Sequence, residues 1–344
     1  MTQYVASGTR MFAEAAEAAT CVEAQHTSAA VLERIGKVLQ QRAPHTVITC
    51  ARGSSDHAAT LAKYLIETRT GIPTASAALS VSSLYASAVR AQGTLCLAIS
   101  QSGRSPDLLA SVSALKQSGS FVLAMVNDAD APLAELADEV LPLSAGAETS
   151  VAATKSYIAS LAMIVRLVAE WSGDRSLHDD LLRLPGLLRQ SWSLDWSPLV
   201  ETLGDCTNMY VVGRGIGLGI AQEAALKLKE TCRIHAEAFS SAELQHGPMV
   251  LVKDGFPVLL FSQVDETAEA MQETGALLAA RGARVLFAGP APAGTQCLPT
   301  ISASPIIQPI LQIQTFYAAV GALALERGLD PDRPAHLSKV TRTI

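Results

Sequence analysis

An internal repeat restricts the fold of this 344-residue chain more than any other feature of its sequence. One landmark, a β-branched run followed by Arg-Gly, ends at Gly53 and again at Gly215. A second landmark, an apolar run followed by Ser-Gln, occurs at Ser100 and again at Ser262. The two offsets, 215 − 53 and 262 − 100, are both 162 residues. Two independent landmarks with one offset predict a duplicated unit.

Each copy reads as strand, Gly/Ser turn, helix, strand, Ser-Gln turn, helix and strand. This alternation is typical of βαβ units in a parallel sheet covered by helices, so we predict an α/β fold with two doubly wound domains. The length agrees, because roughly 150 residues per domain gives about two domains. The predicted organisation is an N-terminal helical arm over residues 1–40, a first domain over 41–173, a linker over 174–198, a second domain over 199–330 and a C-terminal tail over 331–344.

Charge and composition exclude several classes of protein. The formal net charge is −6 and the charges form no block, which leaves little field to attract nucleic acid or an anionic membrane. Charged residues make up 17% and hydrophobic residues 49%, which indicates extensive burial in cores or in a subunit interface. The six cysteines lie far apart without a C-x-x-C pair, and the N-terminus has no apolar signal segment. We therefore expect a soluble, cytoplasmic protein with reduced thiols that binds neither nucleic acid nor membrane.

The strongest local motif is residues 100–107, Ser-Gln-Ser-Gly-Arg-Ser-Pro-Asp, which follows an apolar run and opens a predicted helix. Gly103 permits close approach of the backbone, and the hydroxyls together with the helix N–H groups suit a phosphate or another anion. An ordinary serine-rich N-cap is the alternative interpretation. A second hydroxyl-rich turn, residues 53–57, lies at the same end of the predicted sheet, which is where ligands bind in open α/β sheets.

The second copy lacks this loop, because Val264-Asp265 stands where the first copy has Ser102-Gly103. We therefore expect only the first half to bind an anion. The glycines of residues 213–219 follow the spacing G-x-G-x-G-x-G and not G-x-G-x-x-G, so a nicotinamide dinucleotide is not expected.

One predicted helix, residues 220–234, carries Glu223, Lys227 and Glu230 on a single face. A solvated charged stripe is the simplest interpretation of this pattern. The alternative is functional, because a carboxylate beside an ammonium stays ionised near neutral pH and can act as a proton-transfer base.

Two histidines and two glutamates fall within residues 235–246, but no H-x-x-x-H spacing occurs, so no metal site is predicted. His246 precedes Gly-Pro, and a helix cap is the alternative to a functional role for its side chain. Lys339, near the C-terminus, would by itself be interpreted as a solvated tail lysine.

In their order along the chain, these motifs resemble the sugar isomerase (SIS) domain pair of the glutamine–fructose-6-phosphate aminotransferases. The resemblance covers essentially the whole chain. The motifs that carry it are Met11-x-x-Glu14, Gly53-Ser54-Ser55, Ser100-Gln101-Ser102-Gly103, Glu148-x-x-Val151-Ala152-x-Thr154-Lys155, Glu223-x-x-Leu226-Lys227-Leu228-Lys229-Glu230, His235-Ala236-Glu237-Ala238, Glu243-Leu244-x-His246-Gly247-Pro248 and Leu337-x-Lys339.

The resemblance implies two tandem flavodoxin-like SIS domains that bind a sugar phosphate and use neither a metal nor an organic cofactor. It implies that Glu230 is the base that moves a proton between C1 and C2, with Lys227 alongside. His246 would reach the site of a neighbouring subunit and assist ring opening, which implies a homodimer with shared active sites. Lys339 would lie over the substrate and could form a Schiff base. The implied phosphosugar-binding residues are Gly53, Ser54, Ser55, Ser100, Gln101, Ser102, Gly103, Ser105, Glu148, Val151 and Ala152.

Three differences from the family pattern affect the predicted activity. Ala153 replaces a serine that contacts the sugar, and Arg104-Ser105 replaces Glu-Thr after the Ser-Gln-Ser-Gly motif. No cysteine glutaminase precedes the domain pair in this sequence, so an internal source of ammonia is not expected. We therefore predict a glucosamine-6-phosphate deaminase of the SIS type, which forms fructose 6-phosphate and ammonia. The alternatives are a fructosamine-6-phosphate deglycase, another phosphosugar isomerase, and a non-enzymatic sugar-phosphate sensor.

Overall fold

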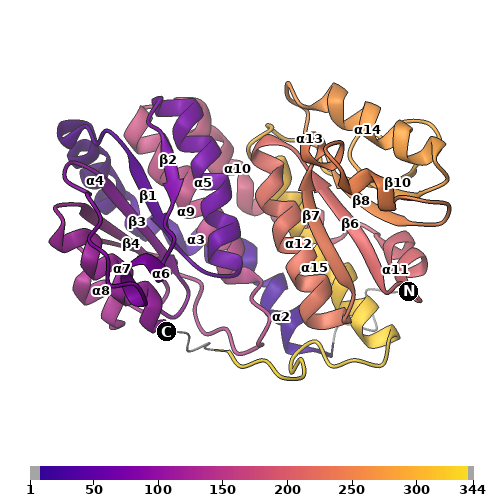
Figure 1. Ribbon diagram of the computed structural model, residues 1–344, viewed down its shortest axis with the longest axis horizontal. Coiled ribbons are helices and arrows are strands. Elements are labelled where there is room, and N and C mark those ends of the chain that lie inside the picture. Colours follow the sequence, from indigo (N-terminus) through magenta and orange to yellow (C-terminus); the bar gives the residue numbers. More distant parts are fainter. Residues whose placement is uncertain (1–7, 340–344) are drawn as a thin grey trace. The chain divides into compact units, whose positions relative to one another are not determined.

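The computed structural model describes residues 8–339 and contains two five-stranded parallel sheets flanked by helices (Figure 1). The strand order is β2-β1-β3-β4-β5 in the first sheet and β10-β9-β8-β6-β7 in the second. Read from its other edge, the second sheet repeats the order of the first. Both sheets have the 2-1-3-4-5 order of flavodoxin-like folds, so the predicted α/β fold with two doubly wound sheets is confirmed.

The first half begins after the N-terminal helices. Its strands are β1 (Val47–Cys50), β2 (Thr74–Ser76), β3 (Leu95–Ser100), β4 (Phe121–Val126) and β5 (Glu139–Pro142). Its helices are α5 (Ser54–Thr70), α6 (Ser80–Ser83), α7 (Pro106–Gln117), α8 (Pro132–Leu136) and α9 (Lys155–Ser172). β3 is buried along its whole length, as expected of a central strand that helices cover on both faces.

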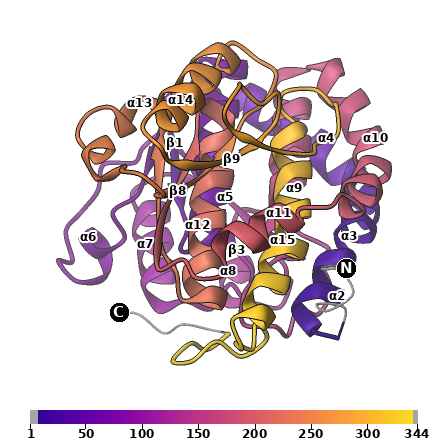
Figure 2. The same cartoon turned by 90° about the vertical axis from the view of Figure 1, so that its right-hand side faces the viewer.

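The second half repeats these elements. Its strands are β6 (Asn208–Gly213), β7 (His235–Ser240), β8 (Pro257–Phe261), β9 (Arg284–Ala288) and β10 (Gln296–Leu298). Its helices are α11 (Ser197–Leu203), η2 (Gly215–Gly217), α12 (Leu218–Cys232), α13 (Ser241–Leu244), η3 (Pro248–Leu251), α14 (Ala268–Ala280) and α15 (Gln308–Glu326). α12 packs against α15 in this half (Figure 2).

Four strands were not expected from the sequence, β2 and β5 in the first half and β7 and β10 in the second. β2 and β10 have only three residues each, and neither contains a β-branched run of the kind that marks β1, β3, β6 and β8. Each is an edge strand that pairs with one neighbouring strand. Its pairing therefore depends on tertiary context more than on local propensity.

The predicted N-terminal arm consists of α2 (Arg10–Ala16), α3 (Ala18–Ala24), η1 (Gln25–Ser28) and α4 (Ala29–Arg42), with residues 1–7 outside the described part. α2 packs on α15, where the side-chain amide of Gln314 donates to the carbonyl of Ala15 at 2.9 Å. α4 packs on α9. The start of the arm therefore packs on a helix of the second half, and its end packs on a helix of the first half.

The chain forms two compact units, and each takes in a short segment from outside its own half of the repeat. The first-half unit comprises Thr20–Glu148, Lys155–Pro185 and the residues from Ser338 onward. The second-half unit comprises the residues up to Ala19, Thr149–Thr154 and Gly186–Leu337. The predicted linker contains α10 (Arg175–Trp192), and Pro185 lies inside this helix at the boundary between the units. The domain boundaries given above remain a proposal.

Candidate functional site

The loop between β3 and α7, in the first-half unit, contains most of the predicted phosphate-binding residues. The hydroxyl oxygen of Ser100 accepts the backbone N–H of Gly103 at 3.0 Å, and that of Ser102 accepts the N–H of Arg104 at 3.4 Å. Gly103 has a φ of 63°, and a Cβ on it would lie 2.7 Å from the Cβ of Ala131. Glycine is therefore required here both by the backbone conformation and by packing.

α7 begins directly after this loop. Ser105 occupies the N-cap position with an extended backbone, but its side chain makes no capping hydrogen bond. Pro106 follows in the first turn, where its missing N–H costs nothing. Ser105 is therefore at the N-cap position, as in the alternative interpretation, but its hydroxyl does not cap the helix. A hydroxyl-rich loop that ends at a helix N-terminus is a suitable environment for a phosphate.

The second hydroxyl-rich turn joins β1 to α5 in the same unit. Gly53 has φ 55° and ψ −132°, and a Cβ on it would meet no heavy atom within 4 Å apart from its chain neighbours. Ser54 and Ser55 form the first turn of α5. Because β1 and β3 pair directly in parallel, this turn and the loop after Ser100 lie at the same edge of the sheet. The fold thus brings the two predicted serine motifs together.

The equivalent loop of the second half is filled by its own side chains. Asp265 Oδ1 accepts the N–H and the hydroxyl of Thr267, at 2.8 Å and 2.5 Å. Asp265 Oδ2 accepts the side-chain amide of Gln263 at 3.0 Å. The Asp265 carboxylate therefore precedes α14 at the position where the first half has the hydroxyl-rich loop before α7.

The charged face of α12 is buried in the second-half unit. The Lys227 side chain is 1% exposed and that of Glu223 is 0% exposed. The Lys227 ammonium lies 3.2 Å from Glu223 Oε1 and 2.6 Å from Glu230 Oε2. The hydroxyl of Tyr317 on α15 also donates to Glu223 Oε1, at 3.1 Å. The solvated-stripe interpretation is therefore wrong, because α15 covers this part of α12.

The charge state of this cluster follows from its geometry. Burial by itself lowers the pKa of Lys227, but the carboxylates of Glu223 and Glu230 outweigh burial and raise that pKa above the ordinary lysine value. Lys227 is therefore a permanent cation near neutral pH. It lies against Glu230, whose side chain is 21% exposed and so accessible to a ligand.

A pocket opens beside Glu230 in the same unit. It is lined by Glu230, Thr231 and Arg233 at the end of α12, by residues 328–330 and by residues 333–335. Arg233 ends α12 in the left-handed conformation, with φ 53°, which corresponds in the repeat to Gly71 at the end of α5. Glu230 is thus the member of the buried cluster that faces an open space.

Lys339 contacts a buried carboxylate in the first-half unit. Its ammonium lies 2.9 Å from Glu148 Oε2, and the Glu148 side chain is fully buried. The Ser156 hydroxyl donates to the same oxygen at 2.6 Å, and the Ser156 N–H donates to Glu148 Oε1 at 3.2 Å. Lys339 is therefore not a solvated tail lysine. The predicted C-terminal tail is described only as far as this residue.

The segment that carries Val151 and Ala152 is held by a carboxylate from α2, within the second-half unit. Glu14 Oε1 accepts the N–H and the hydroxyl of Thr149, at 2.5 Å and 2.9 Å. Its Oε2 accepts the N–H of Ser150 at 3.1 Å. The N–H of Val151 donates to the carbonyl of Asp332 at 3.3 Å. The N-terminal helix therefore fixes a segment predicted to contact the sugar.

His246 lies on an exposed turn between α13 and η3, again in the second-half unit. Its backbone N–H donates to the carbonyl of Glu243 at 2.9 Å. The following helix, η3, presents two exposed apolar side chains, Val250 and Leu251. An exposed histidine next to an exposed apolar pair suits a contact with a second subunit, so the shared site remains a prediction.

The predicted residues therefore form three groups with direct contacts or a common edge: the serine loops, the pair of Lys339 with Glu148, and the cluster of Lys227 with Glu230. The first two groups belong to the first-half unit and the third to the second-half unit. Val151, Ala152 and His246 are not members of these groups, and all three belong to the second-half unit.

Two residues that contact the candidate site residues or their loops were not predicted from the sequence. Tyr317 lies within an apolar helix and carries no motif that would single it out. Arg52 forms an ion pair with the buried Asp107. The repeat has an arginine at the equivalent position, Arg214, and this recurrence could have marked Arg52 as a candidate.

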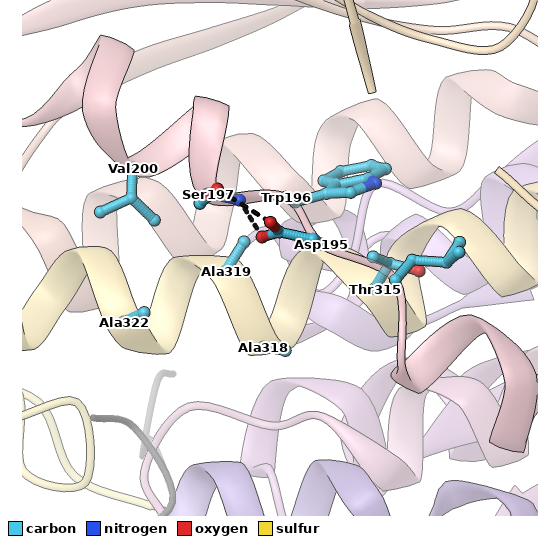
Figure 3. Close-up of a pocket in the computed structure, with 9 residues that line it drawn as sticks. Asp195, Trp196, Ser197, Val200, Thr315, Ala318, Ala319 and Ala322 are labelled. Carbon is cyan, nitrogen blue, oxygen red and sulfur yellow. Dashed lines mark hydrogen bonds between the residues drawn. The ribbon is translucent and has the colours of Figure 1, made fainter. Parts of the chain in front are cut away.

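The pocket in Figure 3 is unrelated to these groups. It lies between the start of α11 and one face of α15, where Thr315, Ala318 and Ala319 line it. Asp195 accepts the N–H of Ser197 at 2.8 Å and so caps α11. The space holds little more than a water molecule, so it is too small for a sugar.

Other chemical features were searched over the described residues. Within residues 8–339, no three His, Cys, Asp or Glu side chains gather as metal ligands would. All six cysteines are free thiols, and burial raises the pKa of Cys232 to about 12. Across the same residues, no helix combines the length and the apolar character needed to cross a membrane.

Comparisons with known protein sequences give consistent matches. The family profile of the SIS domain matches residues 42–169 and 202–288. A glutamine–fructose-6-phosphate aminotransferase (isomerizing) of Methanothermobacter thermautotrophicus is 34% identical over 322 residues, 90% of this chain and 52% of that protein. The corresponding protein of Symbiobacterium thermophilum is 33% identical over 341 residues, 91% of this chain and 54% of that protein. The chain thus spans about half the length of these curated relatives.

Solved structures agree with the sequence matches. A Silicibacter pomeroyi protein, named as a candidate phosphosugar isomerase, superposes with a TM-score of 0.90 at 39% identity, over 94% of this chain and all of that one. The C-terminal domain of a Francisella tularensis glucosamine-fructose-6-phosphate aminotransferase gives 0.86 at 25% identity, over 95% of this chain and 98% of that one. A Thermotoga maritima glucosamine-6-phosphate deaminase gives 0.73 at 22% identity, over 95% of this chain and 100% of that one, which is a likeness of fold alone.

Proposed function

Because this chain belongs to the SIS domain family, we propose that it moves a proton between C1 and C2 of a sugar 6-phosphate, and that it converts glucosamine 6-phosphate and water into fructose 6-phosphate and ammonia. The curated relatives are named for the amination of fructose 6-phosphate, and deamination exchanges the same nitrogen at the same carbon. Water is the solvent, so hydrolytic release of ammonia needs no second bound substrate.

The buried ammonium of Lys227 beside the accessible carboxylate of Glu230 is the observation that carries this proposal. Proton transfer next to a carbonyl needs a base of fixed position and fixed charge. The contact of 2.6 Å between the Lys227 ammonium and Glu230 Oε2 holds this carboxylate in position. The pocket beside Glu230 gives a substrate access to that carboxylate.

The proposed steps balance as follows. After the ring opens to the C1 aldehyde, Glu230 removes the proton from C2, a C1–C2 double bond forms, and the C1 oxygen becomes an enolate. Glu230 returns the proton to C1 while the nitrogen lone pair forms the C2–N double bond, and the nitrogen passes one of its protons to the C1 oxygen, which leaves a C1 hydroxyl and a neutral C2 imine. Water adds to C2, the C2–N bond breaks, and ammonia leaves with the C2 ketone of fructose 6-phosphate. Neither oxidation nor an external electron acceptor is involved.

We assign the remaining roles on the family resemblance together with the local geometry. Two serine-containing loops, after β1 and after β3, bind the phosphate at the start of α7. Lys339, held by Glu148, contacts the open-chain sugar. Val151 and Ala152 contact the sugar, and His246 assists ring opening in the site of a second subunit. These roles require a homodimer.

The direct test is to incubate the purified protein with glucosamine 6-phosphate and to measure ammonia and fructose 6-phosphate. We expect the two products in equal amounts. Glucose 6-phosphate released from a fructosamine 6-phosphate, with no ammonia from glucosamine 6-phosphate, would replace the deaminase with a deglycase. Interconversion of two sugar phosphates without ammonia would indicate a plain isomerase. Binding of sugar phosphate without any turnover would indicate a sensor.

Glu230→Gln tests the assignment of the base. We expect kcat to fall by about a hundredfold or more, in keeping with the usual contribution of general base catalysis. Glu269→Gln, an exposed carboxylate on α14 in the same unit, is the matched control and should keep full activity. Full activity in Glu230→Gln would refute the assignment. Mixed dimers of His246→Asn and Glu230→Gln chains should regain activity if sites are shared.

A further inference from the structure

A buried carboxylate stands at the start of α7, next to the proposed phosphate site. The side chain of Asp107, the second residue of this helix, is 1% exposed. Arg52, whose side chain is 56% exposed, donates to Asp107 Oδ2 from Nε at 2.9 Å and from Nη2 at 2.8 Å. The other oxygen of Asp107 accepts the N–H of Leu108 at 2.9 Å. The Asp107 carboxylate thus fixes the orientation of the Arg52 guanidinium.

The charges of Arg52 and Asp107 affect how a phosphate would bind at the start of α7. A negative side chain is favourable in the first turn of a helix, but the same charge repels a phosphate dianion bound at that turn. The guanidinium of Arg52 offsets the charge of Asp107. A guanidinium has five N–H groups, and its two contacts with Asp107 engage Nε and one Nη only. One arginine can therefore hold a carboxylate and a phosphate together.

The position of Arg52 in the fold places it between the two serine loops. It directly precedes Gly53, and its carbonyl accepts the N–H of Ser55 at 3.2 Å. Its side chain reaches from the loop after β1 to the helix that follows the loop after β3. More than half of the side chain remains exposed although its charged end is anchored.

We propose that Arg52, oriented by Asp107, is a phosphate-binding residue that makes the site select sugar 6-phosphates. This inference rests on the proposed function in taking a sugar 6-phosphate as the ligand. It adds a second cation to a site for which the sequence supplied hydroxyls, a glutamine, backbone groups and Arg104.

The repeat supports this assignment by contrast. Arg214 is the equivalent of Arg52 in the second half, since 214 − 52 is 162, but its Nη1 donates to the hydroxyl of Ser240 at 3.3 Å. The position equivalent to Asp107 is Glu269, which is exposed. Only the first half, which has the hydroxyl loop, joins its arginine to a buried carboxylate.

Arg104 is a weaker choice for the same role. Its Nη2 lies 2.8 Å from Asp128 Oδ2, and both side chains are more than 40% exposed. An ion pair of that kind contributes little and orients its members loosely. The buried partner therefore distinguishes Arg52 from Arg104.

The experiment measures binding of glucitol 6-phosphate by calorimetry, because this probe has no carbonyl and cannot be turned over. We expect Arg52→Gln to weaken binding by about tenfold to one-hundredfold, the loss of a charge-assisted contact. Arg69→Gln is the matched control, a paired arginine near the opposite end of α5, and it should bind as the wild type does. Unchanged affinity in Arg52→Gln would overturn the proposal.

A double variant, Arg52→Gln with Asp107→Asn, separates phosphate contact from charge neutralisation. It leaves no unpaired buried carboxylate, so its fold is less at risk than that of the single variant. We expect its affinity to stay low. Recovery of wild-type affinity would show that Arg52 only cancels the charge of Asp107 and would overturn the proposal.

The same measurements distinguish this inference from the proposed function. A wild-type protein that binds glucitol 6-phosphate through Arg52 but releases no ammonia from glucosamine 6-phosphate would keep the inference and remove the deaminase. A wild-type protein that does not bind glucitol 6-phosphate would remove the phosphate site and the inference together.

Discussion

Replacing Lys227 with methionine removes the cation that lies between two carboxylates on α12. At an effective dielectric constant of about 20, Coulomb's law gives an attraction of about 5 kcal/mol for the 3.2 Å contact with Glu223 and about 6 kcal/mol for the 2.6 Å contact with Glu230. Desolvation of each buried ion offsets several kcal/mol of this attraction. We therefore expect Lys227→Met to lower the free energy of unfolding by about 3–5 kcal/mol at pH 7, the usual cost of breaking a buried ion pair.

The loss should depend on pH in a defined direction. In the wild type the folded-state pKa of Lys227 is raised, so the stabilisation by its ammonium is complete below about pH 10.4 and is lost as the pH rises through the folded pKa. The deficit of Lys227→Met should therefore stay the same between pH 5 and pH 8 and should shrink only as the pH rises above about 10.4.

Urea unfolding followed by tryptophan fluorescence measures these differences, since Trp192 and Trp196 belong to the second-half unit that contains α12. Lys253→Met, an exposed lysine in the same unit, is the control and should cost less than about 1 kcal/mol. The double variant Glu223→Leu, Lys227→Leu removes both buried charges and should recover most of the lost stability. An unchanged urea midpoint for Lys227→Met at pH 7 would refute the reasoning.

Three further predictions concern the other groups of the candidate site. Gly103→Ala should destabilise the protein by about 2 kcal/mol or more and weaken binding of glucitol 6-phosphate, because the new Cβ would stand 2.7 Å from that of Ala131 at a positive φ; urea unfolding and calorimetry measure both effects. Glu14→Gln should raise the KM for glucosamine 6-phosphate more than it lowers kcat, and should speed amide hydrogen exchange in residues 149–150, which lose their carboxylate acceptor. Lys339→Met should abolish ammonia release and destabilise the protein, because it removes the ammonium that lies 2.9 Å from the fully buried Glu148 carboxylate; equal activity of variant and wild type would contradict the assigned role.

Much of the fold could be predicted because duplication repeats the same local signals. The offset of 162 residues, found from two turns, also relates the ends of α5 and α12, where Gly71 and Arg233 both adopt the left-handed conformation. The helical character of the linker was also readable in principle. Four leucines in this segment are buried at helical spacing, namely Leu177, Leu181, Leu184 and Leu188. Pro185 argues against a helix at the level of sequence, but it lies inside α10.

The candidate site was only partly predictable, since burial is a property of packing. The sequence places Glu223, Lys227 and Glu230 on one face but does not tell whether that face is solvated. The answer depends on α15, which lies about ninety positions away in the chain and supplies Tyr317. In the same way, the contact of Lys339 with Glu148 joins residues 191 positions apart and has no local signal.

The repeat places different residues at equivalent buried positions of α5 and α12. The offset of 162 places Leu61 and Leu65 of α5 at the positions of Glu223 and Lys227 on α12, and both leucines are fully buried. The fold is therefore formed equally well by an apolar pair at these positions. Buried ion pairs are often no more stabilising than hydrophobic residues of similar volume, so stability alone does not explain the charges on α12. The first half keeps leucines in its helix and hydroxyls in its loop, whereas the second half fills its loop with Asp265 and places its ions beside Glu230. Within each half, this difference follows the role proposed for it, which is anion binding in the first half and proton transfer in the second.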